Sequence, residues 1–130
     1  MCDFFQPADV IDSYTRKQAI ADGVLVDVTD TAKETGFKYP VAVTQNLWDN
    51  WITPNEQAKR YGQDRDGRLW DVLWMCSLAS RKSKETLVKF SVIFQNGPGQ
   101  KNRHNLVLWA ICGPGDTLAP VITVMLPEDY

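Results

Sequence analysis

The last third of the chain holds the pattern that most constrains the fold: three strand-like segments joined by turn residues. Residues 87–94 (LVKFSVIF) alternate along the chain, and one of their two sides is wholly apolar. Residues 106–111 and 121–126 are also apolar, and the linkers at 95–103 and 113–116 contain Gly and Pro. Consecutive strands joined by turns predict an antiparallel meander.

The first half shows helix signals instead. Thr15 and Gln18 have capping-box spacing, and Gly23 suits the end of a short helix. Residues 24–28 predict a buried strand. A second helix is predicted from Thr29 or Asp30, with its end at residue 36. Residues 39–43 predict an extended segment, with a proline suited to an edge or to strand entry.

Three further helices complete the prediction. One begins after Thr44 and carries two tryptophans, and another has Pro54 as its first residue and ends near Gly62. Residues 63–68 predict a turn. Residues 68–81 predict the main core helix, with Leu69, Leu73 and Cys76 on one face. Trp70 and Trp74 lie beside that face and are assigned to core packing, and a strand at 69–75 is the competing interpretation.

Helices followed by strands predict an α+β domain with the helices packed on one sheet face. A chain of 130 residues fits one domain, residues 1–130, with 1–9 as a loose lead-in. No apolar run approaches the roughly 18 residues that span a bilayer. The N-terminus lacks the pattern of a secretory signal, so a cytoplasmic location is expected. Three cysteines without CxxC spacing argue against disulfides and a zinc site.

Charge is divided by region. Residues 59–103 hold ten Lys and Arg against four Asp and Glu, whereas the two flanks hold four against twelve, for a net charge of −2. Such a division predicts one basic and one acidic surface, which suits recognition of a charged partner.

The charges define two candidate partner-binding surfaces. The acidic surface consists of Asp12, Asp22, Asp27, Asp30 and Glu34. Convergence of these aspartates on Mg²⁺ or Ca²⁺ is the competing reading, but their spacing matches no metal loop, so no metal or cofactor is predicted. The basic surface, for a protein or nucleic acid, consists of Arg81, Lys82, Lys84, Lys101 and Arg103. If strands 87–94 and 106–111 pair, these charges lie at the two ends of one hairpin.

Trp48 and Trp51 are the candidate interface aromatics, because their polar neighbours predict a partly exposed ring. His104 is the single histidine and lies beside a Gly-rich loop that lacks the order of a phosphate cradle. No serine or cysteine has the context of an activated nucleophile, so no catalytic residue is predicted. A site assembled only in space, around His104 or the aspartates, is the enzyme hypothesis that stays open.

Three stretches resemble a known family. They are residues 10–29 (VIDSYTRKQAIADGVLVDVT), residues 67–75 (GRLWDVLWM), and the GPGD turn at 113–116 with residues 120–127 (PVITVMLP). Together they resemble an uncharacterised family of small bacterial proteins found on plasmids, phages and other mobile elements. The resemblance covers residues 10–129 and brings no catalytic residues. It implies a setting in which small proteins often act by binding, for example as inhibitors of host defence.

The leading hypothesis is therefore a non-enzymatic binding protein of a mobile element, such as an anti-CRISPR protein, that binds a host protein or ribonucleoprotein complex. Its acidic surface would imitate DNA phosphates, or its basic segment would dock on an acidic protein. The alternative is a nucleic-acid-binding accessory protein that uses the basic 81–103 segment. The oligomeric state stays open.

Overall fold

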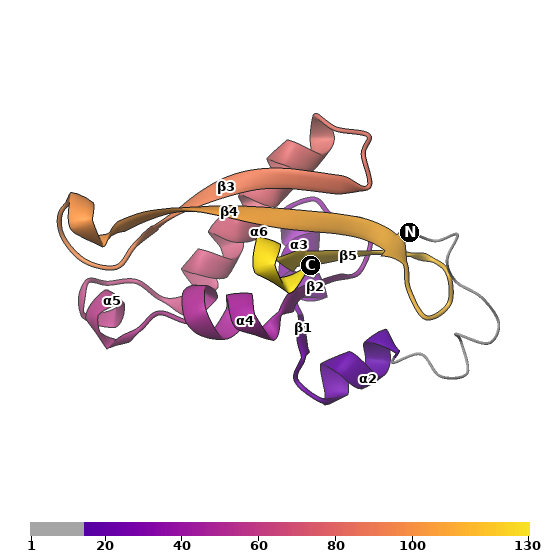
Figure 1. Ribbon diagram of the computed structural model, residues 1–130, viewed down its shortest axis with the longest axis horizontal. Helices are drawn as coiled ribbons and strands as arrows, with labels where there is room; N and C mark the ends of the chain where they lie inside the picture. Colours follow the sequence, from indigo (N-terminus) through magenta and orange to yellow (C-terminus); the bar gives the residue numbers. More distant parts are fainter. Residues whose placement is uncertain (1–14) are drawn as a thin grey trace.

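A five-stranded sheet forms the centre of the structure, a computed structural model that describes residues 15–130. The strands are β1 (Leu25–Asp27), β2 (Val41–Thr44), β3 (Leu87–Gln95), β4 (Arg103–Pro114) and β5 (Pro120–Met125). Their order is β1-β2-β5-β4-β3, and every neighbouring pair is antiparallel except β2 and β5 (Figure 1). The predicted lead-in at 1–9 and Asp12 lie outside the described residues.

Short helices and one long helix connect these strands. They are α2 (Arg16–Ala21), α3 (Thr29–Glu34), α4 (Gln45–Leu47), α5 (Glu56–Arg60) and α6 (Arg65–Arg81), with a π-helix η2 (Trp48–Ile52) and the 3₁₀ turns η3 (Gln100–Asn102) and η4 (Pro127–Asp129). The structure therefore confirms the predicted α+β class.

The predicted meander is confirmed in the order β3, β4, β5. Strands β3 and β4 pair without a break in register, from Leu87 opposite Ile111 to Gln95 opposite Arg103. The alternation of β3 determines this arrangement, because its apolar side faces the core while Lys89, Ser91 and Ile93 face solvent.

The parallel pairing of β2 with β5 has no signal in the local sequence. Val41 lies opposite Ile122, and the side chains of Val41, Ala42 and Val43 are completely buried. A strand buried on both faces reads as a continuous apolar run, and such a run does not reveal which strand it will join. The predicted place of Pro40 at the strand entry is confirmed, and its carbonyl accepts a hydrogen bond from the N–H of Ile122 at 2.9 Å.

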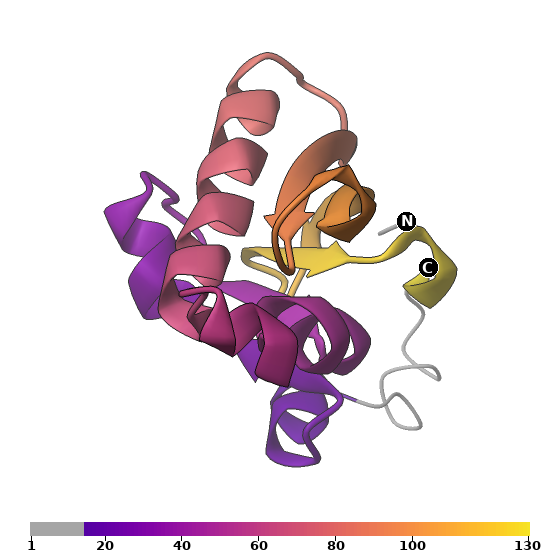
Figure 2. The same ribbon diagram turned by 90° about the vertical axis from the view of Figure 1, so that its left-hand side faces the viewer.

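One face of the sheet is covered by α6, which also confirms the predicted core helix and rejects the strand alternative (Figure 2). Leu69, Val72, Leu73 and Cys76 pack into a single hydrophobic cluster with the inner side chains of β3, β4, β5 and β2. The cluster also contains residues of α3, α4 and η2, so these shorter elements are held by the same core.

The start of α6 differs from the prediction. The turn predicted at residues 63–68 was wrong, because the helix begins at Arg65 with Asp64 as its N-cap. The Asp64 carboxylate accepts a hydrogen bond from the N–H of Gly67 at 2.6 Å. An Asp-Gly pair looks the same in sequence whether it forms a loop turn or the first turn of a helix. Here the N-cap hydrogen bond of Asp64 stabilises the helix.

The capping box of Thr15 and Gln18 is confirmed, whereas the next two elements need correction. Strand β1 is shorter than predicted and is not buried, because it lies at the edge of the sheet. Helix α3 begins at Thr29 itself, with Val28 in the N-cap position and no side-chain cap.

The ends of three helices show how local signals act. Gly36, predicted to end α3, has φ +103°, a conformation that favours glycine. Thr44 caps α4 as predicted, since its hydroxyl accepts from the N–H of Leu47 at 3.4 Å. Pro54 is not the first residue of α5, because Asn55 is the N-cap and its side chain accepts from the N–H of Ala58 at 2.8 Å.

Candidate functional site

The predicted acidic surface lies along the β1 edge of the sheet. Asp22 follows α2, Asp27 ends β1, and Asp30 and Glu34 are one turn apart on α3; all four are exposed. The Asp27 carboxylate accepts a hydrogen bond from the N–H of Thr29 at 3.1 Å, so this residue also shapes the strand–helix connection. Within residues 15–130, no group of three His, Cys, Asp or Glu side chains is placed to hold a metal ion.

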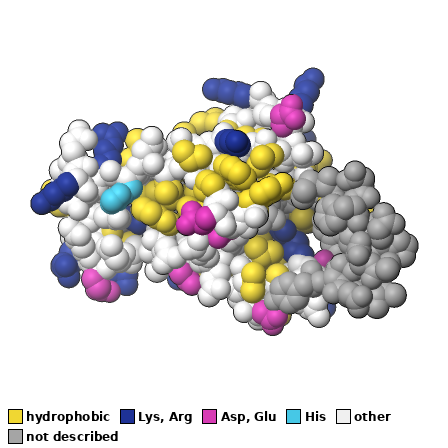
Figure 3. All heavy atoms as spheres, in the orientation of Figure 1, with side chains coloured by type: hydrophobic (Ala, Val, Ile, Leu, Met, Phe, Trp, Pro, Cys, Tyr) yellow, Lys and Arg dark blue, Asp and Glu magenta, His cyan; other side chains and the backbone are white. Residues whose placement is uncertain are grey.

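The predicted basic surface is divided into two groups. Arg81 ends α6 and Lys82 and Lys84 follow it, at the beginning of β3, whereas Lys101 and Arg103 lie at the β3–β4 turn. The nine residues of β3 separate the groups, a length of roughly 30 Å at about 3.3 Å per residue. Figure 3 shows Lys and Arg gathered at these two ends. The hairpin therefore has the predicted charged ends but no continuous basic face.

The predicted interface tryptophans lie on the π-helix η2 and are both half-buried. The ring centre of Trp51 is 5.5 Å from that of Phe94 and 5.5 Å from that of His104. The guanidinium of Arg65 lies 5.4 Å from the ring centre of Trp48. Trp51 thus connects η2 to the β3–β4 hairpin.

The buried side chain of Arg68 strengthens this connection between η2 and the hairpin. Its side chain is only 4% exposed, and it donates hydrogen bonds to the carbonyl of Trp51 at 2.7 Å, to that of Gln95 at 3.3 Å and to the side chain of Asn96. The guanidinium also lies 5.3 Å from the ring centre of Phe94. Burial lowers the pKa of Arg68, yet an arginine stays protonated at any physiological pH. Its position makes Arg68 a structural link between α6, η2 and the hairpin.

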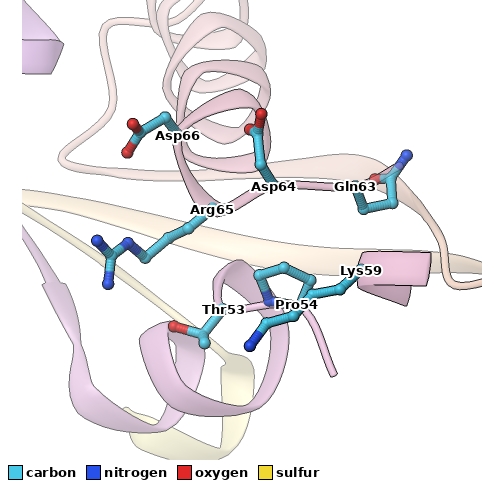
Figure 4. Close-up of a pocket in the computed structure, with 7 residues that line it drawn as sticks. All are labelled: Thr53, Pro54, Lys59, Gln63, Asp64, Arg65 and Asp66. Carbon is cyan, nitrogen blue, oxygen red and sulfur yellow. The ribbon is translucent and has the colours of Figure 1, made fainter. Parts of the chain in front are cut away.

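A surface hollow of about 460 Å³ lies where α5 meets the start of α6. Its charged residues are Lys59, Asp64, Arg65 and Asp66, and Figure 4 shows the two carboxylates pointing away from Lys59. Asp64 is engaged as the helix cap, and Lys59 forms an ion pair with Glu56 at 3.4 Å. His104 does not line the hollow, so this hollow lends no support to the enzyme hypothesis.

The structure exposes a different pair of aromatic residues, Trp70 and Trp74 on α6. Their rings stack at 5.3 Å between centres with an angle of 25°, and the side chains are 39% and 36% exposed. Arg81 extends this surface, with its guanidinium 5.9 Å from the ring centre of Trp74. The assignment of both rings to the core was therefore wrong. We call Trp70, Trp74 and Arg81 the tryptophan face.

One signal in the sequence could have revealed the tryptophan face. Residues 69, 72, 73 and 76 already complete the apolar side that a helix needs for one sheet. At 100° per residue, Trp70 and Trp74 are turned away from the middle of that side. A helix that is apolar around most of its circumference needs cover on both sides, and within residues 15–130 the packing leaves more than a third of each ring exposed on the outer side of α6.

A second apolar surface covers the sheet face opposite α6. Figure 3 shows hydrophobic side chains gathered over β3 and β4 around a central basic residue. Ile93 and Val107 are exposed there, and the Lys89 ammonium lies 4.9 Å from the ring centre of Trp109. The ring of Tyr130 meets Trp109 edge-on at 5.3 Å. Both layers of the molecule thus present aromatic residues to solvent.

These features define a class: a small α+β domain with its longest helix on one sheet face and exposed aromatic residues on that helix. The prediction that the helices pack on one face holds for α6 but not for α2, whose Arg16 donates to the hydroxyl of Thr123 on the opposite face. The chain belongs to the family of unknown function DUF6573, whose model matches residues 1–130. Comparisons with curated proteins and with solved structures give no significant match. Among residues 15–130, no helix is long and apolar enough to cross a bilayer. The family assignment agrees with the resemblance to an uncharacterised family and supplies no activity or partner.

Proposed function

We propose that this protein is a non-enzymatic binding protein that docks on an acidic surface of a partner protein through its tryptophan face. The observation that carries the proposal is the stacked and exposed pair of Trp70 and Trp74. Exposing two large rings costs free energy in an isolated domain, and a partner that covers them recovers it.

The composition of the surface favours a protein over a nucleic acid. Trp and Arg are the residues most enriched at the energetic centres of protein interfaces. Trp70 and Trp74 occupy one face of each other and Arg81 lies against Trp74, which reduces the ring surface on which a nucleobase could stack. The division of the basic residues into two groups also removes the continuous track that a phosphate backbone requires.

The charges beside the tryptophan face indicate the chemistry of the partner. Arg81, Lys82 and Lys84 follow one another at the end of α6, against a single carboxylate at Glu85. A partner with an apolar pocket bordered by Asp or Glu would complement this surface, and the charges would speed association.

The more specific form of the proposal is an inhibitor of a host defence system, carried by a mobile element and directed at a complex such as a CRISPR effector. Its support is the family resemblance, together with two charged surfaces suited to a nucleic-acid-handling complex. The acidic edge of Asp22, Asp27, Asp30 and Glu34 offers a second mechanism, in which the carboxylates occupy a basic channel.

The test is a pull-down from nuclease-treated bacterial lysate with three tagged proteins: the wild type, Trp70→Ala/Trp74→Ala, and the control Tyr61→Ala. Tyr61 is an exposed aromatic residue away from the tryptophan face. We expect one protein partner to be retained by the wild type and the control and lost by the double variant. Equal recovery by all three proteins would exclude the tryptophan face as the docking site.

Two further measurements separate the alternatives. The same pull-down is repeated from lysate without nuclease. A partner recovered only from the untreated lysate would favour the nucleic-acid-binding alternative, and the affinity of the protein for nucleic acid should then fall steeply with salt. For the inhibitor form, DNA cleavage by purified CRISPR effectors is measured with and without the protein. Undiminished cleavage by every effector tested would exclude a CRISPR inhibitor and leave the docking proposal standing.

A further inference from the structure

The outer edge of β3 is a long unpaired strand edge. β3 is the last strand in the sheet order, and within residues 15–130 no strand pairs with its outer side. A nine-residue edge displays a row of backbone N–H and C=O groups, of which the Gln95 carbonyl at its end already accepts from Arg68, and such a row is a template for another strand.

Natural proteins protect such edges with prolines, bulges or charges, and β3 has little of this protection. It contains no proline, and its register with β4 is continuous, so no bulge bends it away. Its one charged residue, Lys89, lies over the ring of Trp109 on the neighbouring strand β4. The charge is therefore drawn toward its own sheet and away from the open edge.

Helix α6 has a second exposed side, turned away from α3 and from the tryptophan face. The hydroxyl of Ser77 donates to the carbonyl of Thr35 at 3.1 Å, which marks the side of α6 that faces α3 and the middle of the molecule. Residues Asp71, Met75, Leu78 and Lys82 follow at helical spacing on the opposite side. Met75 is 39% exposed, and burial raises the pKa of the Asp71 carboxyl. This side combines two apolar residues with one charge of each sign.

We propose that two copies of this chain associate through the outer edges of β3, in antiparallel register, to form one continuous sheet with the two α6 helices side by side. Pairing centred on Ser91 places Val88 opposite Phe94 and Phe90 opposite Val92, so apolar residues of one face meet each other. Lys89 meets Ile93, and no like charges are directly opposed.

The two helices show the same self-complementarity. A twofold axis reverses the helix direction, so the midpoint between Met75 and Leu78 is also the midpoint between Asp71 and Lys82. Met75 of each copy then meets Leu78 of the other, and Asp71 meets Lys82. The pairing uses neither Trp70 nor Trp74, so it is independent of the proposed function and would present the tryptophan face twice.

The first experiment measures the mass of the full chain by sedimentation equilibrium over a wide range of concentration. We expect a dimer, twice the chain mass of 14.7 kDa. Ser91→Lys places two ammonium groups together at the centre of the pairing and should weaken the dimer at least about tenfold. The control Asn105→Lys adds the same charge to the same exposed sheet face on β4 and should leave the dimer intact.

The second experiment exchanges charges on α6, where substitutions on the exposed side leave the core untouched. Asp71→Lys and Lys82→Asp should each weaken the dimer, and the double variant should restore it, because the pairs are re-formed with opposite polarity. A monomeric wild type would overturn the proposal, as would a dimer unaffected by Ser91→Lys and by both single exchanges. Trp70→Ala/Trp74→Ala should leave the dimer unchanged, which keeps this test separate from the docking test.

Discussion

Two pairs of tryptophans with nearly the same helical spacing have opposite surroundings in this molecule. Trp48 and Trp51 on η2 are both half-buried, and Trp51 contacts the hairpin rings of Phe94 and His104 while its carbonyl accepts from Arg68. Trp70 and Trp74 on α6 stack on one another and face solvent. The sequence predicted a partly exposed ring in the first pair, which agrees with its half-buried state, but it assigned the second pair to the core because apolar neighbours surround it.

The difference shows what helical spacing can and cannot predict. Spacing correctly places the members of each pair beside each other. Whether that side is covered depends on how many elements pack around the helix. The short η2 lies against α6 and the hairpin, whereas α6 is covered over its sheet-facing side and along α3.

The largest expected effect on stability comes from Arg68, which binds the carbonyl of Trp51 on the π-helix. Arg68→Ala should lower the free energy of unfolding by about 3 kcal/mol, because it leaves two part-buried carbonyls without their donor and opens a cavity where the buried side chain lay. Guanidinium-induced unfolding measures this loss. The control Arg65→Ala removes an exposed guanidinium from the ring of Trp48 and should cost less than about 0.5 kcal/mol. A cost for Arg68→Ala as small as that of the control would refute its linking role.

The next largest expected difference is between the stability costs of substituting a tryptophan from each pair. Trp51→Ala should cost about 2 to 3 kcal/mol, since the ring packs on Phe94 and His104, whereas Trp70→Ala should cost less than about 1 kcal/mol. The same unfolding experiment gives both values. Iodide quenching sharpens the comparison, because Trp70→Phe/Trp74→Phe should remove much of the quenchable fluorescence. Equal costs for Trp51→Ala and Trp70→Ala would contradict the contrast.

The smallest effect contrasts a buried thiol on the inner side of α6 with a half-buried thiol on β4. Burial raises the pKa of the Cys76 thiol to about 12, and a hydrogen bond with Ser80 opposes this shift. At pH 8 the Cys76 thiol should therefore resist iodoacetamide while the half-buried Cys112 reacts, as mass spectrometry of the alkylated peptides would show. Because the folded-state pKa is raised, the stability that Cys76 contributes is present below about pH 9 and is lost as pH rises toward 12. Rapid labelling of Cys76 in the folded protein would contradict its place in the core.

Local signals predicted much of the fold, and the places where they failed have a common cause. The capping box of Thr15, the cap at Thr44 and the alternation of β3 involve residues close in sequence, so their partners were visible. The N-cap role of Asp64 was missed because an Asp-Gly pair is typical of loops as well as helix starts. The exposed position of β1 was missed because apolar residues alone do not separate an edge strand from a central one.

The candidate site was less predictable than the fold. The sequence alone placed Arg81, Lys82, Lys84, Lys101 and Arg103 at the two ends of one hairpin, because strand pairing and chain order require it. Their separation into two groups follows from the length of β3. The tryptophan face and the buried setting of Arg68 depend on contacts among η2, α6 and the hairpin, which lie far apart along the chain.

By itself, the sequence determined the α+β class, the position of the core helix and the β3–β4–β5 meander, because periodicity and caps act over a few residues. Only the tertiary structure decided that β2 joins β5 in parallel, that β1 and β3 are the sheet edges, and that Trp70 and Trp74 face solvent. The physical reason is that a side chain is often buried by a segment that lies far away along the chain. A side chain is covered when another element packs on it, and no local pattern records which element that will be.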